Sequence, residues 1–457
     1  MFRIILVLFS IIKILTYNIT SFQLYSNIEG APGYGKFMPY RFQFSSDGNI
    51  VISLPRVYEN YDDATQKEYS PYPALLMLEK NNSSPKKMYS LPNIYSVMGF
   101  SLDKDNKLYI LDQGIIIATT NTVIEQSPKL LVYTLNQTYS GKVNETYNFT
   151  GIDLTNSLLT DIAVEHSGAY AYIVDSGNLK NANYNPGIIV LNLQNGKVYK
   201  VLNNHSSFKP YNITNKLRTD EKIKILKYFE EAIGVNCIQI SCNDDTIYYS
   251  SLKNTKIFSV STKDIKNAIK NYENDNSKTK NDILNNIKVN SADIGFEPEN
   301  FVISSKNNIF ALNSEIGYIE ISFSIDKDLS SYNKSLNTNI TFNEDILNKV
   351  YSLNVCNGSL YVLENFLDNK SGANDDKATI YKAEIKNDEL NSNVGCSVFI
   401  FKISGANIFI FVYFFLVLFV TIMIIIANSG DALVKSKAKK DQEKEANIDE
   451  LNKKLNE

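Results

Sequence analysis

The stretch Ser157–Leu202, SLLTDIAVEHSGAYAYIVDSGNLKNANYNPGIIVLNLQNGKVYKVL, predicts the fold of most of this chain. It contains four short apolar segments, DIAVE, AYAYIVD, GIIVLNL and KVYKVL, separated by turns rich in Gly, Asn and Ser. Runs of Val, Ile and Tyr between such turns are typical of β-hairpins. Four strands in about 45 residues form one antiparallel sheet the size of a propeller blade. A single sheet cannot bury both faces, so the stretch predicts further copies of itself.

Fainter copies of this pattern occur on both sides of the stretch. They begin near Tyr40, Met98, Val235, Asn300 and Tyr351. Six units about 45–70 residues apart fit a closed ring, which hides the edges of the sheets. A two-sheet sandwich built from the same strands is the alternative, but the repeated internal order favours an all-β, six-bladed propeller over residues 22–402. FQLYS, Phe22–Ser26, lies ahead of the first unit. We expect it to close the ring by pairing with the last blade beside Ser397–Lys402.

Several segments, taken in order, resemble the landmarks of the major royal jelly/yellow protein family. They are GNIVISLPR, LDKDNKLYILDQG, PKLLVYTLN, TDIAVEHSGAYAYIVDSG with IIVLNL, and NGSLYVLENFLDNK. The resemblance covers roughly Phe22–Lys402 and implies a six-bladed propeller. The chain departs from the family pattern at Tyr109 and Tyr361, where Trp is usual, and at Cys237, where Gly is usual. Membership of a family does not by itself carry over a ligand or an activity.

The two ends of the chain predict a secreted and anchored protein. Residues 1–17 carry Arg3 near their start, followed by a short apolar run, which indicates a signal peptide. An uncleaved anchor is the alternative. Residues 408–427 carry no charge and are long enough, at about 30 Å, to cross a bilayer as a transmembrane helix. Lysines follow in the tail, residues 428–457, and the positive-inside rule places that tail in the cytosol. We therefore expect a single-pass type I membrane protein whose propeller is extracellular or lumenal.

Asn-x-Ser/Thr sequons, candidate sites of N-glycosylation, are dense before the predicted membrane helix and absent after it. The propeller candidates are Asn136, Asn144, Asn148, Asn204, Asn212, Asn333, Asn339, Asn357 and Asn369. The chain has four cysteines, which fit an oxidising compartment. Cys237 and Cys242 stand at opposite ends of one predicted strand and should not pair with each other. Cys356 and Cys396 both belong to the last blade and are the candidate disulfide; without paired CxxC spacing, a zinc site is not expected.

Two inserts interrupt the repeat. Asn215–Ala232 has a helix-forming composition, and Asp264–Asn286 is polar, part helix and part loop. Inserts between blades either cover the channel mouth or decorate the rim, and decoration is the expectation for the second. The net charge of −3 and the lack of a basic, aromatic groove argue against a nucleic-acid surface.

Axial residues are the candidates for ligand binding, because the innermost strand of each blade begins near the propeller axis. The positions are Thr160, Asp161, Asn236, Glu299 and Asn300, with Gly99 in the second blade. Their oxygens could bind Ca²⁺ or a cationic ligand. Gluconolactonase-type propellers, similar in blade layout, hold a metal with such a set that includes a Glu from the first blade. Here the first blade offers Pro39, Tyr40 and Arg41, so no metal or other cofactor is expected. Turn capping by Asp161 and Asn236 is the plainer alternative.

Enzyme signatures such as G-x-S-x-G, a phosphate loop or H-E-x-x-H do not occur. Asp112, Asp175 and Asn365 end second strands, where we expect them to start turns by bonding their own backbone. His166 lies in a predicted turn and is expected to face solvent. The sequence favours a membrane-anchored, glycosylated propeller that binds a small ligand or protein partner without catalysis. The alternative is an enzyme, lactonase-like or of the dopachrome-conversion type, with an axial acidic or metal site. A purely structural surface protein is a third reading.

Overall fold

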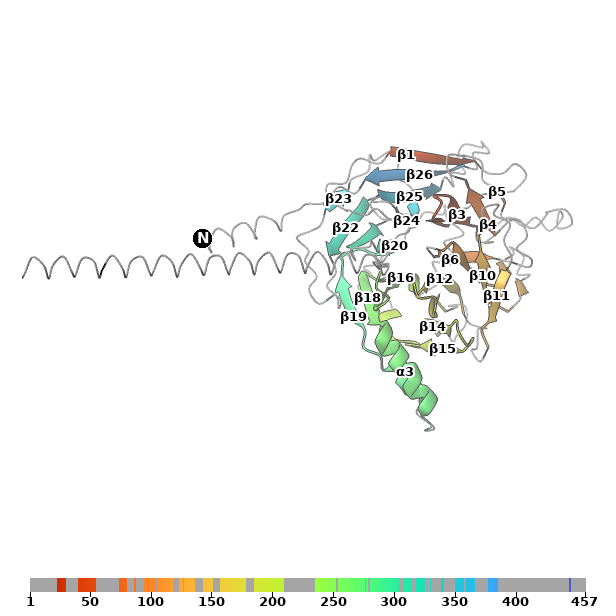
Figure 1. Cartoon of the computed structure of the whole chain (residues 1–457), viewed down its shortest axis with the longest axis vertical. Helices are drawn as coiled ribbons and strands as arrows, with labels where there is room; N and C mark the ends of the chain where they lie inside the picture. Colours follow the sequence, from red (N-terminus) through yellow and green to blue (C-terminus); the bar gives the residue numbers. More distant parts are fainter. Residues whose placement is uncertain are drawn as a thin grey trace, which may run out of the picture. The chain divides into compact units, whose positions relative to one another are not determined.

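The computed structural model carries six four-stranded sheets (Figure 1). It describes residues 23–29, 40–54, 74–79, 86–87, 94, 96–103, 105–117, 123–125, 127–135, 143–150, 157–177, 185–208, 235–251, 254–275, 277, 280–303, 308–313, 318–324, 329, 338–340, 350–356, 359–365, 377–384 and 444.

The first three blades run outward from the axis in the order of the chain. Blade 1 is β2 (Arg41–Phe44), β3 (Ile50–Ser53), β4 (Leu75–Leu78) and β5 (Lys86–Lys87). Blade 2 is β6 (Val97–Leu102), β7 (Lys107–Asp112), β10 (Lys129–Thr134) and β11 (Val143–Asn148), with a separate hairpin of β8 (Ile115–Ile117) and β9 (Val123–Glu125). Blade 3 is β12 (Leu159–Val164), β13 (Tyr170–Asp175), β14 (Gly187–Asn192) and β15 (Val198–Val201). The stretch that predicts the fold is therefore one complete blade.

The other three blades follow the same plan. Blade 4 is β16 (Val235–Ile240), β17 (Thr246–Ser251), β18 (Lys256–Ser261) and β19 (Asn290–Asp293). Blade 5 is β20 (Pro298–Ile303), β21 (Asn308–Asn313), β22 (Tyr318–Ser324) and β23 (Thr338–Ile340). Blade 6 is β24 (Val350–Cys356), β25 (Ser359–Asn365), β26 (Lys377–Glu384) and β1 (Gln23–Glu29). The inner strands contact one another in the cycle β2, β6, β12, β16, β20, β24 and back to β2, so the predicted closed ring of six blades is confirmed.

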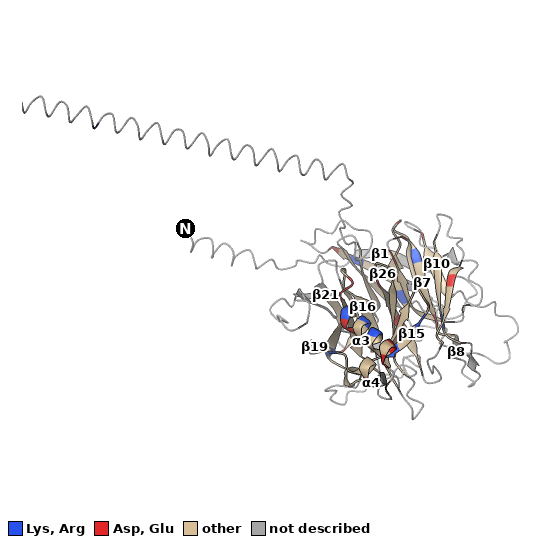
Figure 2. Cartoon of the chain, turned by 60° about the horizontal axis from the view of Figure 1, so that its bottom comes forward, with Lys and Arg blue, Asp and Glu red and all other residues tan. Residues whose placement is uncertain are grey.

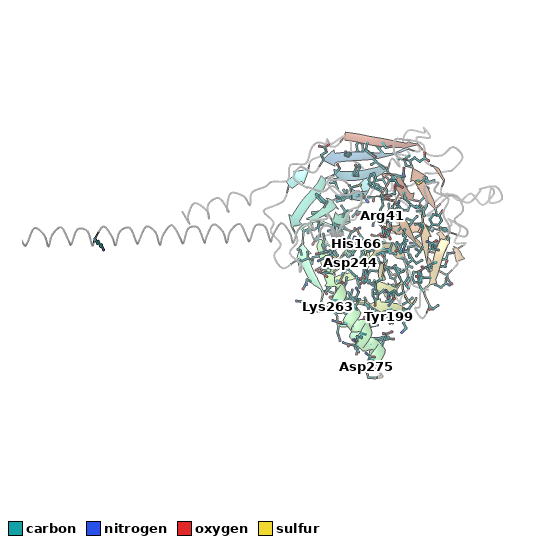
Figure 3. The ribbon with its side chains drawn as sticks, in the orientation of Figure 1. Arg41, His166, Tyr199, Asp244, Lys263 and Asp275 are labelled. Carbon is teal, nitrogen blue, oxygen red and sulfur yellow. The ribbon has the colours of Figure 1, made fainter. Side chains whose placement is uncertain are left out.

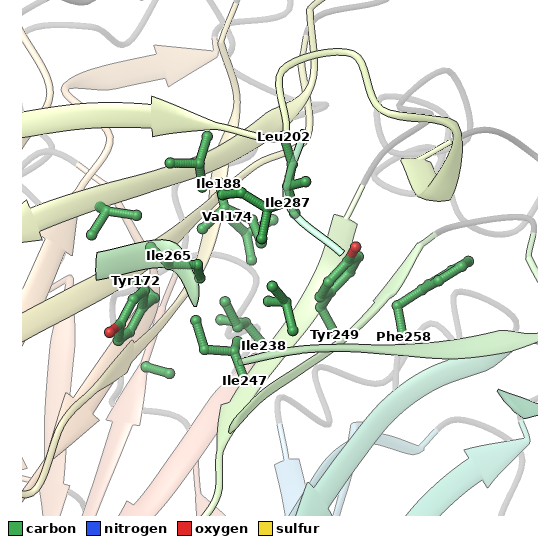
Figure 4. Packing of buried hydrophobic residues seen from close by; sticks show 14 of the residues in the cluster. Tyr172, Val174, Ile188, Leu202, Ile238, Ile247, Tyr249, Phe258, Ile265 and Ile287 are labelled. Atoms are coloured by element: carbon green, nitrogen blue, oxygen red, sulfur yellow. The ribbon is translucent and has the colours of Figure 1, made fainter. Parts of the chain in front are cut away.

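The hydrophobic core consists of layers between neighbouring blades. Figure 4 shows the layer between blades 3 and 4, where Tyr172 and Ile188 face Ile238 and Tyr249. Similar layers join blades 1 and 2, 2 and 3, and 4 and 5, and one joins blade 6 to blade 1. Because both faces of a blade are covered, strands read as unbroken apolar runs, such as IIVL in β14, instead of alternating with polar residues.

The N-terminal latch onto the last blade is confirmed, and the partner that the structure describes is β26. β1 pairs antiparallel with β26, with Ile28 opposite Ala378, and a bulge lies between Leu24 and Ser26. Tyr25 sits in that bulge, and its ring packs edge-on against Tyr361 of blade 6 at 5.1 Å and Phe44 of blade 1 at 6.1 Å. The strand thus covers the seam where the ring closes. Ser397–Lys402 lies outside the described residues.

The second insert is a structural element, which corrects the expectation of decoration. It forms α3 (Thr262–Asn274), whose N-cap Ser261 accepts a hydrogen bond from the Asp264 backbone, and α4 (Lys280–Asn285). Ile265 and Ile269 of α3 are buried in the layer between blades 3 and 4. The outer face of α3 carries both acidic and basic residues (Figure 2). Lys266 reaches Glu165 of blade 3 at 2.6 Å, so the insert joins the two blades.

Three predicted segments lie outside the described residues: the signal peptide at 1–17, the insert at 215–232 and the transmembrane helix at 408–427. Among the residues that the structure describes, no helix has the length and apolar character needed to span a membrane. The chain divides into two units, Met1–Val398 and Phe399–Glu457.

Candidate functional site

A β-bulge recurs at the start of the inner strand in blades 2 to 6. The pairing register shifts between Val97 and Phe100, Leu159 and Asp161, Val235 and Cys237, Pro298 and Asn300, and Val350 and Ser352. A bulge leaves one residue without a partner opposite it and re-aims the neighbouring side chains. In blades 3 to 6 the extra residues are Thr160, Asn236, Glu299 and Tyr351. Three of the predicted axial candidates are therefore bulge residues at equivalent places in neighbouring blades.

In blades 3 to 6 the residues that follow the bulges are Asp161, Cys237, Asn300 and Ser352. Together with Arg41 in blade 1 and Gly99, which lies within the bulge of blade 2, we call them the axial ring. Arg41 takes the equivalent place in blade 1, opposite Ser53, without a bulge. All the polar members are buried, with exposed fractions of 8% for Arg41 and 5% for Asp161 and less for the others. The ring contains three of the predicted residues, Gly99, Asp161 and Asn300, and adds Arg41, Cys237 and Ser352.

An ion pair crosses this ring. The Nη2 of Arg41 lies 3.3 Å from the Oδ2 of Asp161, joining blade 1 to blade 3. Figure 3 places Arg41 inside the circle of sheets. The backbones of blades 2 and 3 approach closely at Asp161, because blade 2 has Gly99 there: a Cβ atom would lie only 2.6 Å from the Cα of Asp161. The same Asp161 oxygen accepts the backbone N–H of Ile238 at 3.1 Å. The carboxylate therefore links blades 1, 3 and 4.

Burial sets the protonation of this cluster. Burial, the largest single effect, lowers the pKa of Arg41, but the interactions with Asp161, Cys237 and Tyr40 together outweigh it, so the pKa ends above its ordinary value and the guanidinium stays charged. For Asp161, burial raises the pKa, opposed by Arg41 and the Ile238 N–H. Burial also raises the pKa of Cys237 to about 12, so its thiol stays protonated. That thiol donates to the Phe301 carbonyl at 3.5 Å and approaches the Asn300 Oδ1 at 3.8 Å, joining blades 4 and 5.

The arrangement does not offer a metal site among the described residues. No group of three His, Cys, Asp or Glu side chains converges there. Thr160 is buried and bonds the Ser176 hydroxyl at 3.1 Å, within its own blade. Asp161, the acidic candidate whose side chain is described, is committed to Arg41 and a backbone N–H. Asn236 and Glu299 are placed by their backbone only.

The second-strand aspartates start turns, as predicted. The Oδ1 of Asp175 accepts the N–H groups of Gly177 at 2.9 Å and Leu158 at 3.1 Å. Asp112 bonds Gly114 and Ser96 in the same way, both at 3.0 Å. Lysines balance both carboxylates, with Lys200 2.6 Å from Asp175. Asn365 lies at the end of β25, and its side chain is not described.

The disulfide is not where the sequence suggested. Cys356 is a buried thiol, and burial raises its pKa to about 11. Cys242 is the disulfide-bonded residue, whereas Cys237 is a buried thiol, so these two do not pair, as expected. The prediction failed because the spacing of cysteines in the sequence does not fix which of them meet in the folded chain. Cys396 lies outside the described residues.

His166 does not face solvent freely, which corrects the expectation. Its turn forms as predicted, with Gly168 at a φ of +66°. The Nδ1 of His166, however, lies 2.6 Å from the Oδ1 of Asp244 in the next blade, and the backbone N–H of His166 donates to the same oxygen at 3.0 Å (Figure 3). Asp244 occupies the fourth position of the equivalent turn, with a φ of +60°.

An equivalent hydrogen bond between turns of neighbouring blades joins blades 1 and 2. Here the N–H of Ser46 donates to the Oδ1 of Asn106, at 2.9 Å, and Asn106 has a φ of +58°. A signal for both ties was visible in the sequence, because Asn106 and Asp244 stand in turns where Gly48 and Gly168 stand in the neighbouring blades.

Three of the glycosylation candidates can be placed with their side chains. Asn144 and Asn148 are exposed on β11, and Asn204 is exposed in a turn. Asn339 lies in β23, and its side chain is not described. Asn136, Asn212, Asn333, Asn357 and Asn369 lie outside the described residues.

Comparison with known proteins agrees with this geometry. A family model described as Major royal jelly protein matches residues 95–396. The chain belongs to the major royal jelly protein family. The search of curated proteins finds no match.

Among solved structures, virginiamycin B lyase from Staphylococcus aureus is similar at 11% identity, with a TM-score of 0.40, over 80% of this chain and 99% of that one. A catalytically inactive variant of that lyase, solved with quinupristin, is similar at 12% identity, with the same TM-score and coverage.

Proposed function

We propose that this member of the major royal jelly protein family is a membrane-anchored, non-catalytic propeller. It binds a small ligand at its mouth on the extracellular or lumenal side. The observation that carries the proposal is the Arg41–Asp161 pair at 3.3 Å. An axial acid or metal ligand must be free to meet a substrate, and this carboxylate is already neutralised by a guanidinium and a backbone N–H.

The same pair supports a binding role. It joins blade 1 to blade 3, and the Ile238 N–H joins blade 4 to the same carboxylate, so contacts between three blades hold the starts of these inner strands together. In four successive blades, a bulge residue lies one position before the member of the axial ring: Thr160, Asn236, Glu299 and Tyr351. By residue type these are a threonine, an asparagine, a glutamate and a tyrosine, a mixture that suits a small ligand with an amine and an aromatic or polar body.

The sequence supports the membrane anchor and the lumenal location in this proposal. The uncharged segment 408–427 and the lysines after it support a single-pass type I arrangement. A rigid scaffold with variable loops, held at a membrane, suits display of a binding surface.

The test is a thermal-shift screen and metal analysis of the full chain in detergent, with Ca²⁺, Mg²⁺, Zn²⁺ and biogenic amines. A ligand at about 100 times its Kd stabilises the fold by about 2.7 kcal/mol, which is visible as a rise in Tm. We expect a shift with an amine that is lost in Glu299→Gln and kept in Glu273→Gln, which removes an exposed acid on α3. Bound metal that is lost in Asp161→Asn would overturn the proposal in favour of the enzyme. No shift with any compound would overturn it in favour of a protein-contact role.

A further inference from the structure

Strand β11 is the outermost strand of blade 2 and carries two sequons within six residues. The sheet order is β11, β10, β7, β6, so β11 pairs on one side only among the described strands. Its sequence VNETYN and the Phe149–Thr150 that follow contain Asn144-Glu-Thr and Asn148-Phe-Thr. Exposed edge strands present unpaired N–H and C=O groups and can pair with a second chain, so proteins protect them. Within the described strand β11, Glu145 is the one charged side chain available to do so.

The face of β11 that bears the second sequon points away from blade 3. Tyr147 turns toward blade 3, because its hydroxyl donates to the carbonyl of Leu193 at 2.6 Å. Side chains alternate along a strand, so Thr146 and Asn148 lie on the opposite face. Asn148 and Thr150 are exposed, while Phe149 between them is buried and holds the strand end in place. Both groups that define the sequon are thus presented to solvent by an ordered backbone.

The first sequon sits at an irregularity in the same strand. The register between β10 and β11 shifts after Val132, which leaves Asn144 as the extra residue of a bulge. Asn144 is exposed, and its Nδ2 donates to the Thr134 hydroxyl at 2.5 Å. A glycosylated asparagine keeps one N–H on that nitrogen, so the sugar and this hydrogen bond are compatible. The bulge itself already bends the edge away from regular pairing.

We propose that Asn144 and Asn148 are N-glycosylated and that their glycans cover the open edge of blade 2. A bulky, hydrated glycan at each end of a six-residue strand blocks the approach of a second strand along its length. The proposal rests on the lumenal location that is part of the proposed function, and goes beyond it by assigning sites and a role.

The experiment uses the full chain expressed in a glycosylating eukaryotic cell line. Peptide mass spectrometry, before and after enzymatic removal of N-glycans, reports occupancy at each sequon. The variant Thr146→Ala/Thr150→Ala removes both sequons, and Thr146→Ser/Thr150→Ser keeps both while changing the same side chains. We expect occupied Asn144 and Asn148 in the wild type and the Ser variant. We also expect self-association by light scattering to rise at least twofold in the Ala variant alone.

Asn204 separates the failure of this proposal from the failure of the lumenal location. It is an exposed sequon far from β11 in the chain, in the turn before η2 (Ser206–Phe208). Glycan on Asn204 with unmodified Asn144 and Asn148 would overturn the β11 sites and leave the proposed function standing. No glycan at any sequon would overturn both. Occupied β11 sites with equal self-association in the Ala and Ser variants would overturn the shielding role.

Discussion

A Cβ atom at Gly99 would lie 2.6 Å from the Cα of Asp161, because the inner strands of blades 2 and 3 meet at this point. Real Cβ atoms do not approach backbone this closely, so one strand would have to move. We expect Gly99→Ala to lower the free energy of unfolding by about 3 kcal/mol through overpacking. The control is Gly295→Ala, where the φ of +85° strains the backbone but nothing lies within 4 Å. That variant should lose only about 1 kcal/mol by chemical denaturation; equal losses would contradict a steric cause.

Replacing only one partner of the Arg41–Asp161 pair should strongly lower the free energy of unfolding. Arg41→Met leaves the Asp161 carboxylate buried without its cation, and such single deletions lose about 3–5 kcal/mol. The double variant Arg41→Met/Asp161→Leu removes both charges and should recover much of that loss. For comparison, Lys197→Ala breaks a pair with Glu273 whose side chains are 59% and 39% exposed. It should cost under about 1 kcal/mol. A double variant less stable than Arg41→Met would contradict this account.

The tie between His166 and Asp244 predicts an acid-dependent loss of stability. Burial acts to raise the pKa of Asp244, but the hydrogen bonds from His166 outweigh it and hold the pKa below its ordinary value. The carboxylate therefore stabilises the fold above about pH 4, the ordinary pKa, and this contribution is lost as pH falls through the folded-state pKa. Denaturant titrations at pH 7 and pH 3 should show a smaller drop for Asp244→Asn than for the wild type. Asn tolerates the positive φ, so the control isolates charge.

The latch should stabilise the seam between blades 6 and 1 through Tyr25. Its ring packs on Tyr361 and Phe44, whose own centroids are 4.5 Å apart. Tyr25→Ala removes these contacts and should cost about 1–2 kcal/mol, since Tyr25 is 37% exposed and such aromatic pairs contribute about 0.5–1.5 kcal/mol beyond buried area. Tyr25→Phe keeps the ring and should remain within about 0.5 kcal/mol of the wild type in thermal unfolding. Equal effects of the two variants would show that the ring is not the stabilising element.

Thiol reactivity tests the cysteine assignment. Burial raises the pKa of Cys237 to about 12 and of Cys356 to about 11, and only the thiolate reacts with disulfide reagents. The native protein at pH 7.5 should therefore react slowly or not at all. Denaturation without reductant should expose the two thiols of Cys237 and Cys356, and reduction should raise the total to the four cysteines of the chain. Reaction of Cys242 before reduction would contradict its disulfide.

The sequence alone determined the elements that arise from local pattern. Strand runs and Gly, Asn and Asp turns depend on neighbouring residues, so the blade Ser157–Leu202, its five copies and the turn role of Asp175 could be predicted. The family could be recognised from the same segments, because their order along the chain matches the family even where single residues differ. That Thr160, Asn236 and Glu299 lie at the starts of their inner strands also followed, because the repeat fixes where each strand begins.

Contacts between blades were decided only by the tertiary structure. Arg41 reaches Asp161 across 120 residues of chain, and no local pattern encodes such an approach. His166 meets Asp244, β1 meets β26, and Cys242 instead of Cys356 forms the disulfide for the same reason. Each depends on how twisted sheets face one another after the ring has closed. Closure of the ring places side chains from distant segments within hydrogen-bonding distance, and the buried charged groups are paired there.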